Sequence, residues 1–161
     1  VLALFGGFIS VHVLGIFEPV MKFHPELFFF TPLIAAMAGN VGVQSSAIIV
    51  QGLANNTIIG PVVERLLKEL SLSLLNGVIL SVILLAGSYF LLGYEIHVGY
   101  TVSIALLSVI IMASLIGTFI PIILNKYGID PALATGPFIT TSNDILGILT
   151  YFTIAKVILG I

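Results

Sequence analysis

Residues 131–158 read PALATGPFITTSNDILGILTYFTIAKVI, a long apolar stretch with a carboxylate, Asp144, near its centre. A membrane-spanning helix needs about 20 predominantly apolar residues, so this stretch predicts a spanning helix. A charged side chain at the centre of a bilayer costs about 2.5–3.5 kcal/mol on insertion scales. The chain otherwise keeps its charges at the ends of such stretches. Asp144 therefore indicates an ion or proton pathway, as in a transporter or channel.

The composition of the whole chain is that of an integral membrane protein. Of its 161 residues, 59% are hydrophobic and 7% are charged, whereas soluble domains carry about 25% charged residues. The net charge of −2 gives no reason to expect a nucleic-acid partner. Because the chain has no cysteine, disulfides, thiolate metal sites and cysteine nucleophiles are excluded.

Charges, prolines and polar clusters divide the chain into five candidate spans, which predicts an all-α membrane protein with five transmembrane helices. The spans cover about residues 1–17, 26–54, 70–92, 98–124 and 131–158. Barrel strands would alternate apolar and polar residues, and these runs do not. We interpret residues 1–161 as a single transmembrane domain. Because the chain begins at Val1, inside an apolar run, we expect it to come from a longer protein.

The connection before the third span carries four of the twelve charged residues of the chain. Residues 62–70 predict a short amphipathic helix that starts after Pro61, with Glu64–Lys68 and Arg65–Glu69 spaced to pair on a solvated face. With five spans, three cations fall on this side of the membrane and two on the other. By the positive-inside rule this loop is cytoplasmic.

The second span holds the first of two polar clusters. Its middle contains Gly39, Asn40, Gly42, Gln44, Ser45 and Ser46. Small residues let helices approach closely, and amides and hydroxyls bond across them, so a helix-packing seam is one interpretation. So many polar groups at membrane depth also suit a hydrated path.

The second polar cluster surrounds Asp144. At about 100° per residue, one helix face carries Pro137, Thr140, Asp144, Gly147 and Tyr151. Gly136-Pro137 predicts a loosened, kinked backbone with free carbonyls one turn earlier, because Pro137 has no amide donor. Free carbonyls at membrane depth are tolerated only against protein or a water-filled cavity. This combination is typical of a cation site.

The ligand chemistry favours a hard cation. The pathway offers oxygen ligands, which suit Mg²⁺, Ca²⁺ or Mn²⁺. Mg²⁺ keeps several waters and is usually bound through one or two carboxylates, so one Asp144 from each of two chains would suffice. His12, His24 and His97 are scattered and are expected to be interfacial or packing residues. No HExxH, GxSxG or P-loop pattern occurs, and we expect no enzymatic activity.

The two polar clusters resemble the MgtE family of Mg²⁺ channels and transporters. Residues 32–45, PLIAAMAGNVGVQS, are similar to that family's second-helix motif. Residues 130–147, from Asp130-Pro131 through Gly136-Pro137-Phe138 and Thr140-Thr141 to Asp144 and Gly147, resemble its fifth-helix motif. The similarity covers the whole chain as a five-helix membrane domain.

The resemblance implies a homodimer whose pore lies on the two-fold axis, between the second and fifth helices. It implies that Asp144 holds hydrated Mg²⁺ and that Gly136 and Thr140 belong to turns that offer backbone oxygens. Together with the polar clusters it predicts a pore lined by Gly39, Asn40, Gly42, Gln44, Pro137, Thr141 and Gly147. The family also has cytosolic regulatory domains that this sequence lacks, so such an upstream domain is a candidate partner.

We therefore expect a multi-pass protein of the cell membrane, in a bacterial or archaeal inner membrane, that transports Mg²⁺. Mn²⁺, Co²⁺ and Ca²⁺ are further candidate ions. The expected partners are a second copy of the chain, the lipid bilayer and divalent metal ions. Two alternatives stay open: an exchanger that couples divalent cations to H⁺ or Na⁺, and a non-transporting scaffold whose polar seam holds subunits together.

Overall fold

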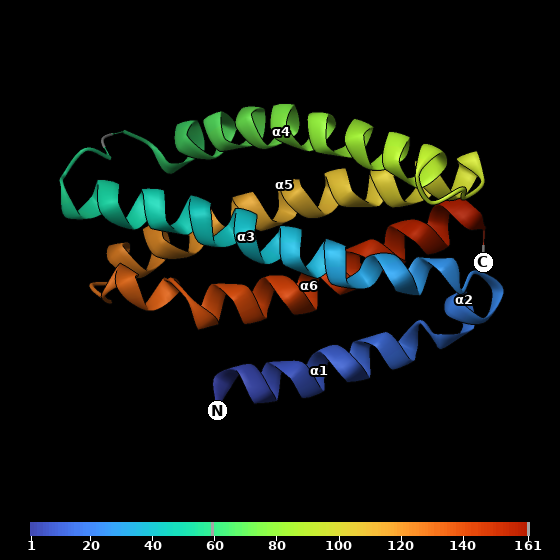
Figure 1. The fold of residues 1–161 in the computed structure, drawn as a ribbon. Helices are drawn as coiled ribbons and strands as arrows, with labels where there is room; N and C mark the ends of the chain where they lie inside the picture. Colours follow the sequence, from blue (N-terminus) through green and yellow to red (C-terminus); the bar gives the residue numbers. More distant parts are fainter. Residues whose placement is uncertain (59, 161) are drawn as a thin grey trace.

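The computed structural model describes residues 1–58 and 60–160, and within them every regular element is a helix. The elements are α1 (Leu2–Ile16), α2 (Glu18–Phe23), α3 (Glu26–Ala54), α4 (Val62–Phe90), α5 (Ile96–Lys126), the 3₁₀ helix η1 (Pro131–Ala134) and α6 (Pro137–Leu159). Figure 1 shows the long helices side by side, with the N-terminus, the α3–α4 connection and η1 at one end. Helix α2 and the C-terminus lie at the other end.

Among the described residues, four helices are long and apolar enough to cross a membrane, which confirms an all-α, multi-pass membrane protein. Helices α3 and α4 have 29 residues each, α5 has 31 and α6 has 23. At about 1.5 Å per residue, each exceeds the hydrocarbon thickness of about 30 Å. Helix α1, which corresponds to the first of the five expected spans, has 15 residues and is a shorter apolar helix.

Two boundaries differ from the sequence-based expectation. The amphipathic segment at residues 62–70 is not a separate piece, because it forms the first turns of α4 without a break. The last span does not run from Pro131 as one kinked helix. Residues 131–134 form η1, and α6 starts afresh at Pro137. The second difference arises at Pro137, because proline is well suited to the first position of a helix.

Helix α5 is the centre of the bundle. It packs against α3, α4 and α6. Its residues Val102, Ala105, Val109 and Ala113 follow helical spacing and are fully buried. Small and β-branched side chains on this face let three neighbours approach the same helix. Helix α1 instead lies at the edge of the bundle and packs along α6 (Figure 1).

A seam of small residues sets the closest helix approach. A Cβ atom on Gly117 of α5 would overlap the backbone carbonyl of Gly42 on α3. A Cβ on Gly42 would overlap the amide nitrogen of Asn143 on α6. Asn143 is fully buried, and neither polar atom of its amide has a hydrogen-bond partner within the described residues. The polar run of α3 therefore does serve as a helix-packing seam at Gly42.

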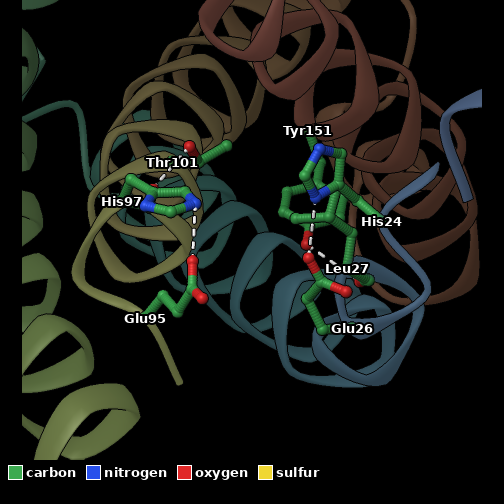
Figure 2. A network of polar contacts seen from close by, with 7 residues as sticks. All are labelled: His24, Glu26, Leu27, Glu95, His97, Thr101 and Tyr151. Carbon is green, nitrogen blue, oxygen red and sulfur yellow. Dashed lines mark hydrogen bonds and ion pairs between the residues drawn. The ribbon is translucent and has the colours of Figure 1, made fainter.

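Polar side chains at the α2 end of the bundle pair locally (Figure 2). The Nδ1 atom of His24 lies 2.8 Å from Glu26 Oε1, and the Nε2 atom of His97 lies 3.0 Å from Glu95 Oε2. The buried Tyr151 hydroxyl donates to the carbonyl oxygen of Leu27 at 2.9 Å, which joins α6 to α3. These contacts fit the expectation that the histidines have interfacial and packing roles.

Exposed charges near this end also find partners. Glu18, at the start of α2, lies 2.8 Å from the Lys22 ammonium. The hydrogen bond from Lys22, together with its positive charge, holds the pKa of Glu18 below its usual value. Glu18 therefore stays ionised as a boundary charge.

At the opposite end, Glu69 of α4 ties three helices together. Its Oε1 atom accepts a hydrogen bond from Ser45 Oγ of α3 at 2.7 Å and another from Ser114 Oγ of α5. Both serines are buried. The expected pair of Glu64 with Lys68 is confirmed at 2.7 Å. The expected pair of Arg65 with Glu69 is wrong, because Glu69 turns toward the serines instead of solvent.

The small-residue seam predicts the effect of adding one methyl group. We expect Gly117→Ala to lower the free energy of unfolding by about 1–3 kcal/mol, because the new Cβ meets rigid backbone rather than a side chain. Circular dichroism of the protein in detergent, followed with temperature, measures the change. Gly87→Ala in α4 is the matched control, since a Cβ there meets nothing within 4 Å. Equal unfolding temperatures for both variants would contradict the close α3–α5 approach.

The Glu69 contacts predict a second stability effect. We expect Glu69→Ala to destabilise the bundle by about 2–3 kcal/mol, because two buried serine hydroxyls lose a charged acceptor. Glu69→Gln keeps an acceptor oxygen and should lose less. Glu64→Ala, which removes an exposed carboxylate on the same helix, should leave the unfolding temperature nearly unchanged. The same thermal measurement tests all three variants. A larger loss of stability for Glu64→Ala than for Glu69→Ala would contradict the stabilising role of the Glu69 hydrogen bonds.

Candidate cation site

Asp144 lies two turns into α6, on a wall between two hollows. The α1-side hollow, of about 440 Å³, lies between α1 and α6. It is lined by Ala3, Gly6, Gly7, Ser10, Gly136, Pro137, Thr140, Thr141 and Asp144. The α3-side hollow, of about 260 Å³, lies between α3 and α6 and is lined by Ala35, Ala36, Gly39, Asn40, Val43, Gln44, Thr140 and Asp144. Thr140 and Asp144 line both hollows.

The break before α6 places these two side chains. Gly136 has φ +62° and ψ −132°, a conformation that side-chain-bearing residues rarely adopt. It lets the chain leave η1 and start a new helix at Pro137. Thr140 then donates to the Gly136 carbonyl oxygen twice, from its backbone N at 3.0 Å and from its Oγ1 at 3.1 Å. Thr140 is thus held by the helix start.

At this break the carbonyl oxygen of Gly136 is not free. Pro137 occupies the first position of α6, where a backbone N–H would have no intrahelical partner anyway. The Gly136 carbonyl accepts both bonds from Thr140. The Asp130 side chain accepts from the backbone N of Ala132 at 2.9 Å. Asp130 therefore caps η1 rather than α6.

Helix α3 comes close to Asp144 because it carries a glycine there. A Cβ atom built on Gly39 would lie 3.5 Å from Thr140 Cγ2 and 3.7 Å from Asp144 Oδ1. A longer side chain at this position would fill the α3-side hollow. Gly39 thus brings the α3 backbone to the wall on which the carboxylate stands.

Asn40 and Gln44 line the α3-side hollow on its outer, exposed side. They lie one turn apart near the middle of α3, and both side chains are exposed on the surface of the bundle. Within residues 1–58 and 60–160, neither amide makes a hydrogen bond to the rest of the chain, and Asp144 has no such partner either. Two amides and a carboxylate are therefore available for water, an ion or another chain.

The structure gathers most of the predicted site residues, with two exceptions. Gly39, Asn40, Gln44, Gly136, Pro137, Thr140, Thr141 and Asp144 line one or both hollows. Gly42 and Gly147 line neither. Gly42 is packed against Asn143, and a Cβ on Gly147 would lie 3.0 Å from Ala38 Cβ. These two glycines support helix packing in this structure.

Helix α1 supplies part of the site, which the sequence analysis did not predict. Gly6, Gly7 and Ser10 line the α1-side hollow. A Cβ atom on Gly6 would overlap the side chain of Thr141, so the two helices touch beside the hollow. The signal was present in the spacing of Gly6 and Ser10, which puts two small residues on one helix face.

The chemistry of the site is that of a single carboxylate among neutral oxygen donors. Within the described residues, no three His, Cys, Asp or Glu side chains gather closely enough to hold a metal ion. A carboxylate with nearby amides and hydroxyls can hold a hard cation that keeps most of its water, as Mg²⁺ commonly does.

Comparison with a family model and with known proteins points to the same family in each case. The family model MgtE, described as a divalent cation transporter, matches residues 31–154. The chain is 39% identical over 156 residues to "Magnesium transporter MgtE" of Bacillus subtilis, covering 96% of this chain and 34% of that relative. It is 31% identical over 160 residues to the protein of the same name from Thermus thermophilus, covering 99% and 35%. The Enterococcus faecalis protein of that name is 34% identical over 156 residues, covering 95% and 34%. The chain thus spans about a third of the length of these relatives.

Proposed function

Because this chain belongs to the MgtE family of divalent cation transporters, we propose that it carries Mg²⁺ across the cell membrane through a channel-like pore. The pore lies on the two-fold axis of a homodimer, between α3 and α6 of each copy. The observation that carries this proposal is the outward-facing polar group of Asn40, Gln44 and Asp144 at the α3-side hollow. We call this group, with Thr140, the polar face.

The polar face needs a cover at membrane depth. Helices α3 and α6 are both long and apolar enough to cross a bilayer. Polar groups inside the hydrocarbon must contact protein or a water-filled cavity, because lipid tails offer no hydrogen bonds. A second copy of the same face, related by two-fold symmetry, would enclose a hydrated space. Intramembrane polar side chains in that arrangement line an ion path.

In this proposal two Asp144 side chains attract one hydrated Mg²⁺ ion. A single carboxylate from each chain suits an ion that keeps its inner waters, since those waters then bond to the surrounding oxygens. Asn40 and Gln44 offer amide oxygens from α3, and Thr140 offers its hydroxyl from α6. The Gly136 carbonyl oxygen would also contribute, by facing the water around the ion while it accepts a hydrogen bond from Thr140 Oγ1. Mn²⁺, Co²⁺ and Ca²⁺ are chemically similar candidates for the same path.

The central prediction concerns the charge of Asp144. We expect Asp144→Asn to reduce Mg²⁺ entry into proteoliposomes at least tenfold, because it keeps the shape of the side chain and removes the charge that attracts the ion. Uptake is followed with an indicator inside the vesicles, with no H⁺ or Na⁺ gradient imposed. Asp130→Asn is the matched control, since this carboxylate caps η1 and lines neither hollow.

Each outcome of the uptake experiment decides something. Wild-type entry by the Asp144→Asn variant would overturn the site. No entry by the parent chain, followed by entry once an H⁺ or Na⁺ gradient is imposed, would favour the coupled exchanger. Loss of the dimer in the Asp144→Asn variant, seen by size-exclusion chromatography, would favour the scaffold.

The homodimer makes a separate prediction, which the absence of cysteine makes easy to test. A single Gln44→Cys substitution should give a cross-linked dimer with a short bismaleimide in membranes, because both copies of Gln44 face the axis. Val82→Cys is the control, since Val82 is 59% exposed on α4 and faces lipid in the proposed dimer. Equal cross-linking at both positions, or none at Gln44→Cys, would count against a dimer through the polar face.

A further inference from the structure

A third hollow, with a polar lining, lies away from the cation site, at the end of the bundle where α3 ends, α4 begins and α5 ends. This α3–α4–α5 pocket has a volume of about 330 Å³. The residues that line it include Pro61, Val62, Glu64, Arg65, Lys68 and Lys126. The volume lies at the lower end of the range of about 300–1,000 Å³ for small-molecule sites.

The charges around the pocket are unbalanced. Arg65, Lys68 and Lys126 face it with one carboxylate, Glu64. Lys68 and Glu64 pair with each other at 2.7 Å, whereas Arg65 and Lys126 have no ion-pair partner in the described part of the chain. The carboxylate of Glu69, one turn beyond Arg65, is occupied by Ser45 and Ser114. Two cations therefore lack an anion.

Arg65 also has an unused donor. Its Nε atom is buried and has no hydrogen-bond partner among the described residues. A buried donor without a partner costs about 1–3 kcal/mol, more when the group is charged. An anion in the pocket would remove that cost. The guanidinium fork matches the oxygens of phosphate and holds them through two parallel bonds.

The backbone adds to the positive potential. Pro61 precedes α4 in an extended conformation, and no side chain caps the helix. The first N–H groups of a helix have no intrahelical acceptor, and the aligned peptide dipoles put partial positive charge at this end. Pro61 and Val62 line the pocket, so the start of this 29-residue helix meets it beside the Arg65 side chain.

We propose that the α3–α4–α5 pocket binds a phosphate group, supplied by the headgroup of an anionic phospholipid or by a soluble phosphate compound. The pocket lies at the end of three helices, where membrane-spanning segments meet the headgroup region. The positive-inside rule puts this end in the cytoplasmic leaflet, whose anionic lipids are recognised by basic pockets between spanning helices. This site does not depend on Mg²⁺ transport by the chain.

Native mass spectrometry of the purified chain in detergent tests the proposal. The probes are phosphatidylglycerol, phosphatidylcholine with matched acyl chains, and inorganic phosphate. We expect the chain to retain phosphatidylglycerol in preference to phosphatidylcholine. The double variant Arg65→Gln/Lys126→Gln should bind it about thirtyfold more weakly, since each basic residue near an anionic surface contributes roughly fivefold.

Matched variants separate a site from general attraction to charge. Lys22 lies in the last turn of α2 and Lys156 in the last turn of α6, and Figure 1 shows α2 and the C-terminus at the other end of the bundle. Lys22→Gln/Lys156→Gln removes the same charge from these two helices and should leave the affinity unchanged. Lys126→Gln alone keeps Arg65 in place and should weaken binding about fivefold. This single variant keeps the test valid even if the Arg65 substitution disturbs folding.

The outcomes distinguish the two phosphate sources. Preferred binding of phosphatidylglycerol that millimolar phosphate does not displace assigns the pocket to a lipid headgroup. Phosphate binding that depends on Arg65 and Lys126, without preference between the lipids, assigns it to a soluble phosphate. Equal retention of both lipids with no phosphate binding would overturn the proposal. The same holds for an equal loss of affinity in the Lys22→Gln/Lys156→Gln control.

Discussion

The fold depends on one constraint, namely that a polar group inside the hydrocarbon needs a partner from protein or water. Most of the chain meets this constraint by burying backbone bonds inside helices and by placing apolar side chains around α5. Among the polar side chains that remain, Asn143 is buried without a hydrogen-bond partner in the described chain, and two further groups differ in how they are placed. Ser45 and Ser114 are buried and bonded to Glu69. Asn40, Gln44 and Asp144 have no partner in the described chain, and they gather at one hollow.

The small-residue seam decides where that hollow forms. Gly117 lets α5 touch the α3 backbone at Gly42, and Gly42 leaves room for Asn143 on α6. With α3 and α6 fixed at this contact, Gly39 brings the α3 backbone against Thr140 and Asp144. The glycine seam and the candidate cation site are therefore formed by neighbouring residues of the same two helices, α3 and α6. In the proposed pore, a buried glycine contact would hold the two walls at a fixed distance while the exposed amides face the ion.

The bounds of individual helices show how much of the fold could be predicted from the sequence. The bounds of α3 agree with the expected span at residues 26–54, because a proline and an Asn-Asn pair mark its ends. The helix start after Pro61 was expected, but the charged residues suggested a separate interfacial piece at residues 62–70. In the structure the helix continues from this piece into the span without a break. The break at Gly136 was expected as a kink. A positive φ at glycine cannot be told from an ordinary helical glycine in sequence alone.

Hydropathy alone determined that the chain crosses a membrane several times, because the free energy of placing a residue in lipid depends mainly on its own side chain. The sequence also determined that Asp144 is the one carboxylate inside the last span and that its surroundings resemble the MgtE family. Only the tertiary structure decided that α1 contributes Gly6, Gly7 and Ser10 to the site, that Gly42 and Gly147 pack instead of lining a hollow, and that Glu69 leaves Arg65 unpaired. Helical periodicity says which residues share a face. Which neighbour that face meets depends on contacts between segments far apart in the chain.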